Sequence, residues 1–340
     1  MKGFLVLSNR HELVPLYHRL RREGHETHLV VWNSRFESVW DGLATKLVRR
    51  SDSTLTPENL IPAIEAAKAG DLTVLTTVPL AAQWFGDAQR LYGPGPTSTP
   101  PADHVLFGGW FTGEEVKAPH LLVADWGAWA GGQGATVLGG LTLVRPTGDL
   151  PTGILTALAK ATDTLKAASY RGLFHFDVVE DPSTGELLLR GLQSGWGTLH
   201  THAFVAELES LGAVLLGEAP TLARRFVTVL PVTQPPWPSA RQGERRAPTE
   251  VGGLTPTQQG KVFWHDITVD KEHRKLFTAG LDGMVGVVTG SSDGTPSLAR
   301  ARALELAVRM ELVEKQYRTD VGALVDPALA TLEERWGVVL

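Results

Sequence analysis

The most constraining feature of this sequence is the alternation of short apolar runs with helical segments in its first third. Residues 3–7 form a continuous apolar run that breaks into a polar turn, and apolar residues at helical spacing follow over residues 13–20. The next expected elements are a strand, a helix and a second strand, at residues 28–32, 57–69 and 72–76. Strands that alternate with helices favour a parallel, doubly wound sheet, so we expect an α/β, Rossmann-like domain over residues 1–98.

Two changes in composition divide the rest of the chain. Residues 93–101 are rich in proline and glycine. Because proline removes backbone donors and restricts its neighbours, neither a helix nor a central strand is expected there. Composition shifts again beyond residue 230, where three prolines fall within residues 234–238. We therefore expect three domains, over residues 1–98, 99–231 and 232–340.

The second and third parts differ in their expected elements. Residues 127–140 are rich in glycine and small side chains, which tolerate close approach of the backbone. A helix and the two strands of a hairpin are expected after them, at residues 154–168, 172–180 and 186–192. The third part has two expected strands and a strongly periodic helix, at residues 261–264, 284–289 and 297–313. This last part is therefore expected to be a compact α+β module.

Composition excludes several classes of partner and location. The net charge of -5 gives the chain no general attraction for nucleic acid, and the arginine-rich run at residues 241–246 is expected to be a solvated loop. No apolar run approaches the roughly 20 residues that span a bilayer, and the apolar N-terminus is too short for a secretory signal. The chain has no cysteine. We expect a cytoplasmic protein with neither a nucleic-acid nor a membrane partner.

Short motifs in the third part point to a known family. Three segments read VFWHDIT, GMVGVVT and KQYRTDVG, at residues 262–268, 283–289 and 315–322. They resemble, in the same order, the VFHAGT, GGRVLGVT and YRTDIG motifs of glycinamide ribonucleotide synthetases. This is the phosphoribosylamine–glycine ligase family of the ATP-grasp superfamily.

The resemblance extends upstream and covers most of the chain. The segments FTGEEV, AGGQGA and YRGLF are similar to the family's FLEGEEVS, TGGMGA and YRGVLYAG, and they lie at residues 111–116, 130–135 and 170–174. Residues 79–94 are similar to the family's PEAPLVAG and FGPS tract. The resemblance implies a Rossmann-like N-terminal domain, a truncated ATP-grasp core and a small C-terminal α+β domain.

Departures from the family pattern concern ATP and magnesium. Between Pro94 and Phe111, where the family has the lid subdomain whose lysines neutralise nucleotide phosphates, this chain has only the proline-rich connector. Where the family reads Glu-Phe-Asn, this chain has Gly191, Leu192 and Gln193, and glycine offers magnesium no ligand. We therefore expect a degenerate member that is not an ATP-using ligase and needs neither ATP nor magnesium. It is expected to bind a small phosphoribosyl- or nucleotide-like ligand, a protein partner or a second copy of itself.

The resemblance also supplies candidate site residues. A turn similar to the family's GREHA motif lies at the mouth of the expected Rossmann-like sheet, where ligands bind, and helix capping is the alternative role. With the glycine-rich loop, the candidate ligand-binding residues are Asn9, Arg10, His11, Glu12, Gly131, Gly132, Gln133 and Gly134. Asp177 and Glu180 are candidate metal ligands, and ordinary polar residues at a strand edge are the alternative.

An active ATP-dependent carboxylate–amine ligase with an unusual site is the main alternative function. ATP and magnesium would then bind, with the metal held by Glu114, Glu115, Asp177 and Glu180. A third alternative is ATP-independent chemistry on a nucleotide, which no nucleophile–base pair in the sequence supports.

Histidines and tryptophans flank the expected cleft. His200 and His202 alternate as they would on one face of a strand, but with His175 they lack a fourth ligand for zinc. The tryptophans expected to fill the space of the missing lid are Trp126, Trp129 and Trp196.

Overall fold

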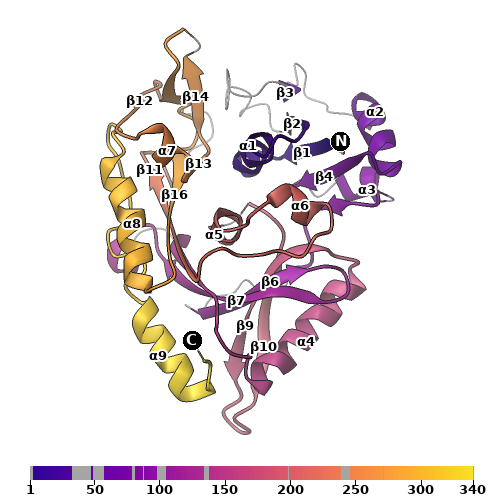
Figure 1. The fold of residues 1–340 in the computed structure, drawn as a ribbon, viewed down its shortest axis with the longest axis vertical. Helices are drawn as coiled ribbons and strands as arrows, with labels where there is room; N and C mark the ends of the chain where they lie inside the picture. Colours follow the sequence, from indigo (N-terminus) through magenta and orange to yellow (C-terminus); the bar gives the residue numbers. More distant parts are fainter. Residues whose placement is uncertain are drawn as a thin grey trace.

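The structure is a computed structural model that describes residues 3–32, 47–48, 57–78, 81–86, 88–97, 105–133, 138–197, 199–238, 246–270 and 272–339. These residues form a five-stranded sheet, an eight-stranded sheet and a small three-stranded sheet. Figure 1 shows the five-stranded sheet beside the three-stranded one, with the eight-stranded sheet below and between them. The expected α/β fold class is confirmed.

The five-stranded sheet is parallel and doubly wound. Its strands, in the order β3-β2-β1-β4-β5, are β3 (Leu47–Val48), β2 (Thr27–Val31), β1 (Gly3–Ser8), β4 (Leu72–Thr76) and β5 (Leu91–Tyr92). Because side chains alternate along a strand, Phe4 and Val6 pack toward α1 (Val14–Arg22), while Leu5 and Leu7 pack toward α2 (Pro57–Lys68) and α3 (Ala81–Phe85). Burial on both faces explains the unbroken apolar run that predicted β1.

The eight-stranded sheet is antiparallel and forms the centre of the molecule. Its strands, in spatial order, are β10 (Leu187–Ser194), β9 (Gly172–Glu180), β6 (Val105–Phe111), β7 (Val116–Trp126), β8 (Leu138–Val144), β11 (Phe226–Thr233), β16 (Met284–Ser292) and β13 (Val262–Trp264). Helix α4 (Thr152–Ala167) covers one face of it with Ile154, Ala157, Ala161 and Leu165. Helices α5 (Leu199–Ala206) and α6 (Leu211–Leu215) lie on the other face, between the two large sheets (Figure 1).

The end of the chain completes the large sheet and covers one edge of the molecule. The small sheet consists of β12 (Glu250–Val251), β15 (Lys275–Thr278) and β14 (Ile267–Asp270), with α7 (Pro256–Gln259) nearby. Helices α8 (Pro296–Arg309) and α9 (Val325–Trp336) follow one another along the left edge in Figure 1. A 3-10 turn, η2 (Ala130–Gly132), precedes β8. Since β11 spans residue 231 and pairs with both β8 and β16, backbone pairing continues across the second expected boundary. The division into three domains stays a prediction.

Most of the expected elements are confirmed within a few residues. These include the first strand and helix, the hairpin of β9 and β10, and the periodic helix α8. Gly24 adopts a φ of 87° immediately after the C-cap residue of α1, a left-handed conformation that glycine tolerates best. In the described part of the chain, no helix has the length and apolar character required to cross a membrane.

Candidate functional site

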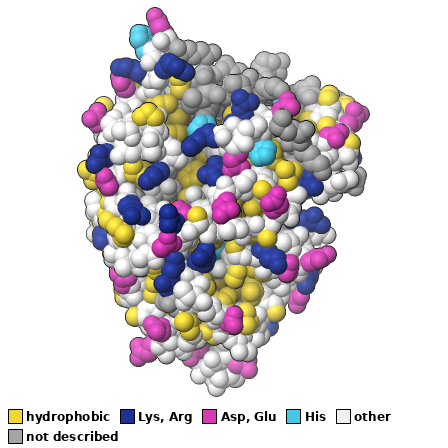
Figure 2. Space-filling model, viewed as in Figure 1, with side chains coloured by type: hydrophobic (Ala, Val, Ile, Leu, Met, Phe, Trp, Pro, Cys, Tyr) yellow, Lys and Arg dark blue, Asp and Glu magenta, His cyan; other side chains and the backbone are white. Residues whose placement is uncertain are grey.

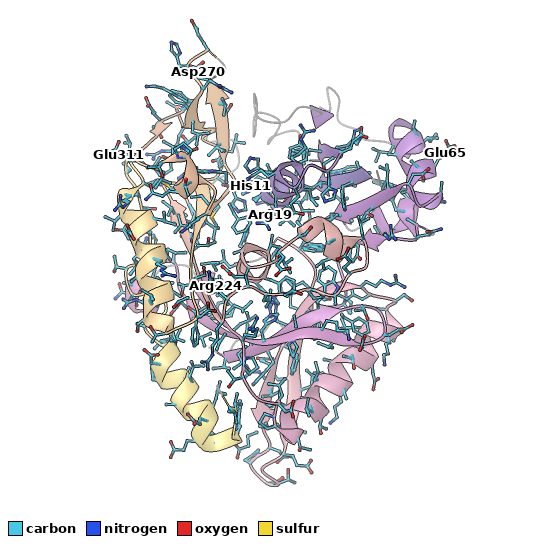
Figure 3. All side chains as sticks on the ribbon, in the orientation of Figure 1. His11, Arg19, Glu65, Arg224, Asp270 and Glu311 are labelled. Carbon is cyan, nitrogen blue, oxygen red and sulfur yellow. The ribbon has the colours of Figure 1, made fainter. Side chains whose placement is uncertain are left out.

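A cavity of about 320 Å³ lies where all three parts of the chain meet. Its walls come from the turn after β1, from strands of the large sheet, from α5, and from the segment around His265. The apolar wall includes Leu106, Leu122, Trp126 and Met284. Five histidines also line it: His11, His175, His200, His202 and His265. His11 itself lies between α1 and the last part of the chain (Figure 3).

Three histidines form a first histidine row across the large sheet (His120, His200 and His175). The Nε2 atoms of His120 and His200 are 2.6 Å apart, and the Nδ1 atoms of His200 and His175 are 3.0 Å apart. At one end, His120 Nδ1 lies 2.8 Å from the carbonyl oxygen of Ala118, and at the other His175 Nε2 lies 3.1 Å from Gln193 Oε1.

The space for this row is provided by Gly108 on β6. In the sheet register, Gly108 stands opposite both His120 on β7 and His175 on β9. A Cβ atom on Gly108 would lie 3.1 Å from His120 Nε2 and 3.1 Å from His200 Cε1. The missing side chain therefore lets the ring of His200, from α5, sit between the two strand histidines.

Counting protons fixes the orientation of the Gln193 amide. Burial lowers the pKa of both His120 and His175 to about 4 and places the pKa of His200 well below its usual value. Three neutral imidazoles carry three N–H donors. The row has four contacts, so it would need four N–H donors if carbonyl oxygens accepted at both ends. We infer that Gln193 turns its NH2 group toward His175, since the two ends of an amide are interchangeable at equal geometry.

A second histidine row (His202, His265 and His11) runs toward a carboxylate. His202 and His265 approach through their Nε2 atoms at 3.0 Å, and His265 and His11 through their Nδ1 atoms at 3.1 Å. His11 Nε2 then lies 2.7 Å from Asp282 Oδ2. Three neutral imidazoles suffice here, each N–H pointing along the row toward Asp282.

His11 differs from the other histidines in its electrostatics. Burial lowers its pKa, but the neighbouring charge of Asp282, the hydrogen bond to it and the charges of Asp266 and Glu12 together outweigh burial and leave the pKa raised. The pKa of His265 is held well below its usual value by burial and by the adjacent histidines. A proton taken up by this row is therefore held at His11, where the Asp282 carboxylate balances it.

Asp266 holds the loop that carries Asp282. Its Oδ2 atom accepts hydrogen bonds from the amides of Leu281, Asp282 and Gly283, at 2.8, 3.1 and 3.1 Å. Burial raises the pKa of Asp266. The position of Asp282 beside His11 is thus set by the residue that follows His265 in sequence.

Helix α5 connects the two rows. Residues two apart on an α-helix point about 200° apart, so His200 and His202 face opposite sides. His200 enters the first row and His202 the second. The expectation that these two residues alternate on one face of a strand is wrong, because residues 199–206 are helical.

The predicted turn at residues 9–12 is closed by its own side chains. Glu12 Oε2 accepts hydrogen bonds from the Arg10 amide at 2.8 Å and from Ser8 Oγ at 3.0 Å. The Asn9 amide donates to Thr77 Oγ1 at 2.8 Å. A carboxylate of the chain thus takes a backbone amide that a bound phosphate would require. His11 and Glu12 line the cavity, whereas Asn9 and Arg10 are not among its described lining residues.

The glycine-rich candidates lie apart from the cavity. Gly131, Gly132 and Gln133 are exposed, and the Gly131 amide donates to Asp320 Oδ2 at 2.8 Å. Arg318 pairs with the same Asp320 and donates to the Trp126 carbonyl at 2.6 Å. Gly134 lies outside the described residues. The described part of this loop is thereby attached to the end of the chain.

The candidate metal ligands Asp177 and Glu180 are held by different arginines. Asp177 is fully buried and forms an ion pair with Arg190, and Glu180 pairs with Arg335 at 2.5 Å. Three positions apart on β9, the two carboxylates point to opposite faces of the sheet. Among the described residues, no group of three or more histidine, aspartate or glutamate side chains is arranged to hold a metal ion.

The three tryptophans have different surroundings. Trp126 lines the cavity, and Trp196 is buried against Tyr92 and Trp110. Trp129 is 40% exposed and fills no internal space.

Sequence analysis did not identify His120, His265 or Asp282 as site residues. The segment that contains His265 and Asp266 carries a motif similar to the family's, and the adjacent histidine and aspartate are the one local sign of a site there. His120 lies on a strand without any motif, so its role depends on register alone.

Comparison with known proteins finds similarity to solved structures in fold and none in sequence. No family model matches the chain, and no curated protein matches it in sequence. It superposes on the phosphoribosylamine–glycine ligase of Thermotoga maritima with a TM-score of 0.56 at 13% identity, over 94% of this chain and 99% of that chain. A biotin carboxylase of Campylobacter jejuni, solved as a βγ-ATP complex, gives 0.55 at 11% identity over 92% of each chain. The urea carboxylase of Kluyveromyces lactis gives 0.56 at 13% identity, over 99% of this chain but 32% of that chain.

These similar structures are ATP-grasp proteins, so the chain has an ATP-grasp fold. The expectation from the sequence motifs is confirmed at this level. The narrower likeness to glycinamide ribonucleotide synthetases stays a proposal.

Proposed function

We propose that this chain is a degenerate ATP-grasp protein that binds a small ligand in the histidine-lined cavity and does not use ATP to form a bond. The lining of the cavity carries the proposal: of the described residues around it, none is lysine or arginine, and five are histidines. Sites that use ATP neutralise the phosphates with lysine, arginine and magnesium. A cavity without such cations favours an uncharged ligand.

Two further features support the loss of ATP use. The connector between β5 and β6 spans only residues 93–104, which is too short for a lid subdomain. At the edge of the sheet, Gly191 stands opposite Asp177, and the neighbouring Arg190 neutralises that carboxylate. A magnesium ion would have to displace the arginine before Asp177 could bind it.

The shape and polarity of the cavity favour a ring with hydrogen-bonding groups. Gln193, Glu12 and the histidines can donate to or accept from such a ring, and Trp126 offers an apolar surface. The base or ribose of a nucleotide-like ligand meets this description. Its phosphate would not be held at the Arg10 amide, which Glu12 already binds.

Calorimetry with the whole protein tests this proposal. Adenosine, inosine and uridine are titrated in turn, followed by Mg·ATP. We expect at least one nucleoside to bind, and Gln193→Leu to weaken it, because this variant removes a polar group from the wall. Binding of Mg·ATP with a Kd below about 1 mM would contradict the proposal. If no nucleoside binds, the small-ligand half is wrong, and a protein partner or a second copy of the chain takes its place.

The second candidate is an active ATP-dependent carboxylate–amine ligase, favoured by the match in fold to a phosphoribosylamine–glycine ligase. Its metal shell would need Glu114 and Glu115, which lie at an exposed turn where Glu115 pairs with Lys117 at 2.7 Å. The assay is phosphate release with ATP, magnesium, glycine and phosphoribosylamine. Release above background would establish this function and remove the first.

A cytoplasmic location remains our proposal, supported by the absence of cysteine from the sequence.

A further inference from the structure

A second cavity, the basic cleft, opens between α1, the start of β13 and α8. Its volume is about 390 Å³, and its walls include Arg19, Arg22, Lys261 and Arg302. A smaller hollow of about 270 Å³ continues from it past His18 and Arg22. Figure 2 shows lysine and arginine side chains spread over the face drawn there, with acidic side chains among them.

The guanidinium groups of the basic cleft are positioned by main-chain carbonyls. Arg22 Nη1 donates to the Gly260 carbonyl at 3.3 Å, and Arg302 Nη1 donates to that of Ser291. Such a bond orients a guanidinium without neutralising it, and it leaves the other N–H donors available. In the described part of the chain, no ion pair with a carboxylate is found for Arg22, Lys261 or Arg302.

The two glutamates in the wall of the basic cleft, Glu207 and Glu305, form no ion pair with Arg22, Lys261 or Arg302 in the described part of the chain. Glu305 pairs at 2.9 Å with Arg309, which is not one of the four cations that line the cleft. Burial raises the pKa of Glu207. Arg19 is balanced by Glu23 at 2.5 Å, so the cations of the cleft without an ion pair among the described residues are Arg22 on α1, Lys261 before β13 and Arg302 on α8.

We propose that the basic cleft binds a small organic phosphate with at least two negative charges. Three cations that converge from α1, from the residue before β13 and from α8 match a compact anion better than an extended chain. The cleft has the volume of a small-molecule site. This site is separate from the histidine-lined cavity and does not depend on the function proposed for it.

Titration of the full-length protein with inorganic pyrophosphate, without magnesium, tests the proposal. Citrate serves as a second probe, because it carries similar charge on carboxylates. We expect saturable binding of pyrophosphate that weakens when salt is raised from about 0.05 M to about 0.2 M. The double variant Arg22→Gln, Lys261→Gln is expected to bind at least about tenfold more weakly.

Lys160→Gln is the matched control, since Lys160 is an exposed cation on α4, away from the basic cleft. It should change the Kd less than about twofold. Both residues of the double variant are exposed, and an unchanged melting temperature verifies folding. If the double variant does not fold, Lys261→Gln alone gives the test. No saturable binding, an unchanged Kd in the folded variant, or tighter binding of citrate than of pyrophosphate would each overturn the proposal.

Discussion

His11 Nε2 lies 2.7 Å from Asp282 Oδ2, although the two residues are 271 positions apart in the chain. The contact ties the turn after β1 to the loop before β16. This contact is the end of the second histidine row. His11 has a raised pKa, whereas the pKa of its neighbour His265 is lowered.

Asp282→Asn is expected to lower the pKa of His11. Burial is the largest single influence on this group and lowers its pKa, and the charge of Asp282, the hydrogen bond to it and the charges of Asp266 and Glu12 together outweigh burial. Without that charge, the pKa should fall below the usual value of about 6.5. Ring-nitrogen NMR of the histidines during a pH titration measures the change. Asp293→Asn, at an exposed pair with Arg224, is the control and should leave His11 unaffected. An unchanged His11 titration in Asp282→Asn would show that the pair does not set its pKa.

Gln193→Glu is expected to raise the pKa of His175 from about 4. A carboxylate only accepts, so the first histidine row would then have acceptors at both ends and need a fourth proton. His175 should titrate near or above about 6.5 in this variant and remain low in Gln193→Leu. The same NMR titration measures it. Equal titration in both variants would contradict the amide orientation inferred here.

Stability is expected to decrease with acidity between about pH 6.5 and pH 4. The pKa values of His18, His120 and His175 are lowered to about 4 by burial, and in the unfolded chain each is about 6.5. The unfolded state thus binds more protons in this window, which favours unfolding. The raised pKa of His11 acts in the opposite sense: its contribution is complete below about 6.5 and is lost as the pH rises through the raised value.

Urea denaturation at about pH 7.5, 6 and 5 measures the balance. Five lowered histidines, since His200 and His265 are lowered as well, against one raised histidine give a net loss on acidification. His120→Asn, which removes one of the five lowered histidines, should flatten the pH dependence. A stability that rises steadily toward pH 5 would show that these histidines are not buried as neutral groups.

Gly108→Ala is expected to destabilise the fold by about 1–3 kcal/mol, because the added Cβ would overpack a filled site. That atom would lie 2.7 Å from the Phe174 carbonyl oxygen and would press on the first histidine row. Gly93→Ala is the matched control, because its Cβ would meet only Thr76 Cγ2 at 3.6 Å. Urea denaturation of both variants compares them. Equal stability would mean that the row does not require the gap at Gly108.

Periodicity and apolar runs were sufficient to predict the strands and helices of the first part of the chain, because β1 is buried on both faces and α1 has one apolar stripe. The same signals did not predict strands β6, β7 and β8. β6 and β8 each contain two adjacent glycines, and β7 contains a proline and charged residues. These strands become recognisable through their pairing with distant segments.

The site shows the same limit. His11 could be proposed from a local turn, since its neighbours in sequence form that turn. The first histidine row could not be predicted from the sequence. It depends on Gly108 standing opposite two histidines from other strands and on α5 being helical. Register and tertiary packing decide such contacts, and neither is written in local spacing.

Glu12 fills the turn at residues 8–13 with a negative charge of the chain's own. Because its carboxylate accepts from Arg10 and Ser8, this side chain stands where an anion bound to the turn would lie. The backbone there is ordered before any solute arrives, and it gains no further order from phosphate. An anionic solute would therefore have to displace the Glu12 carboxylate before it could bind the Arg10 amide at this end of the cavity.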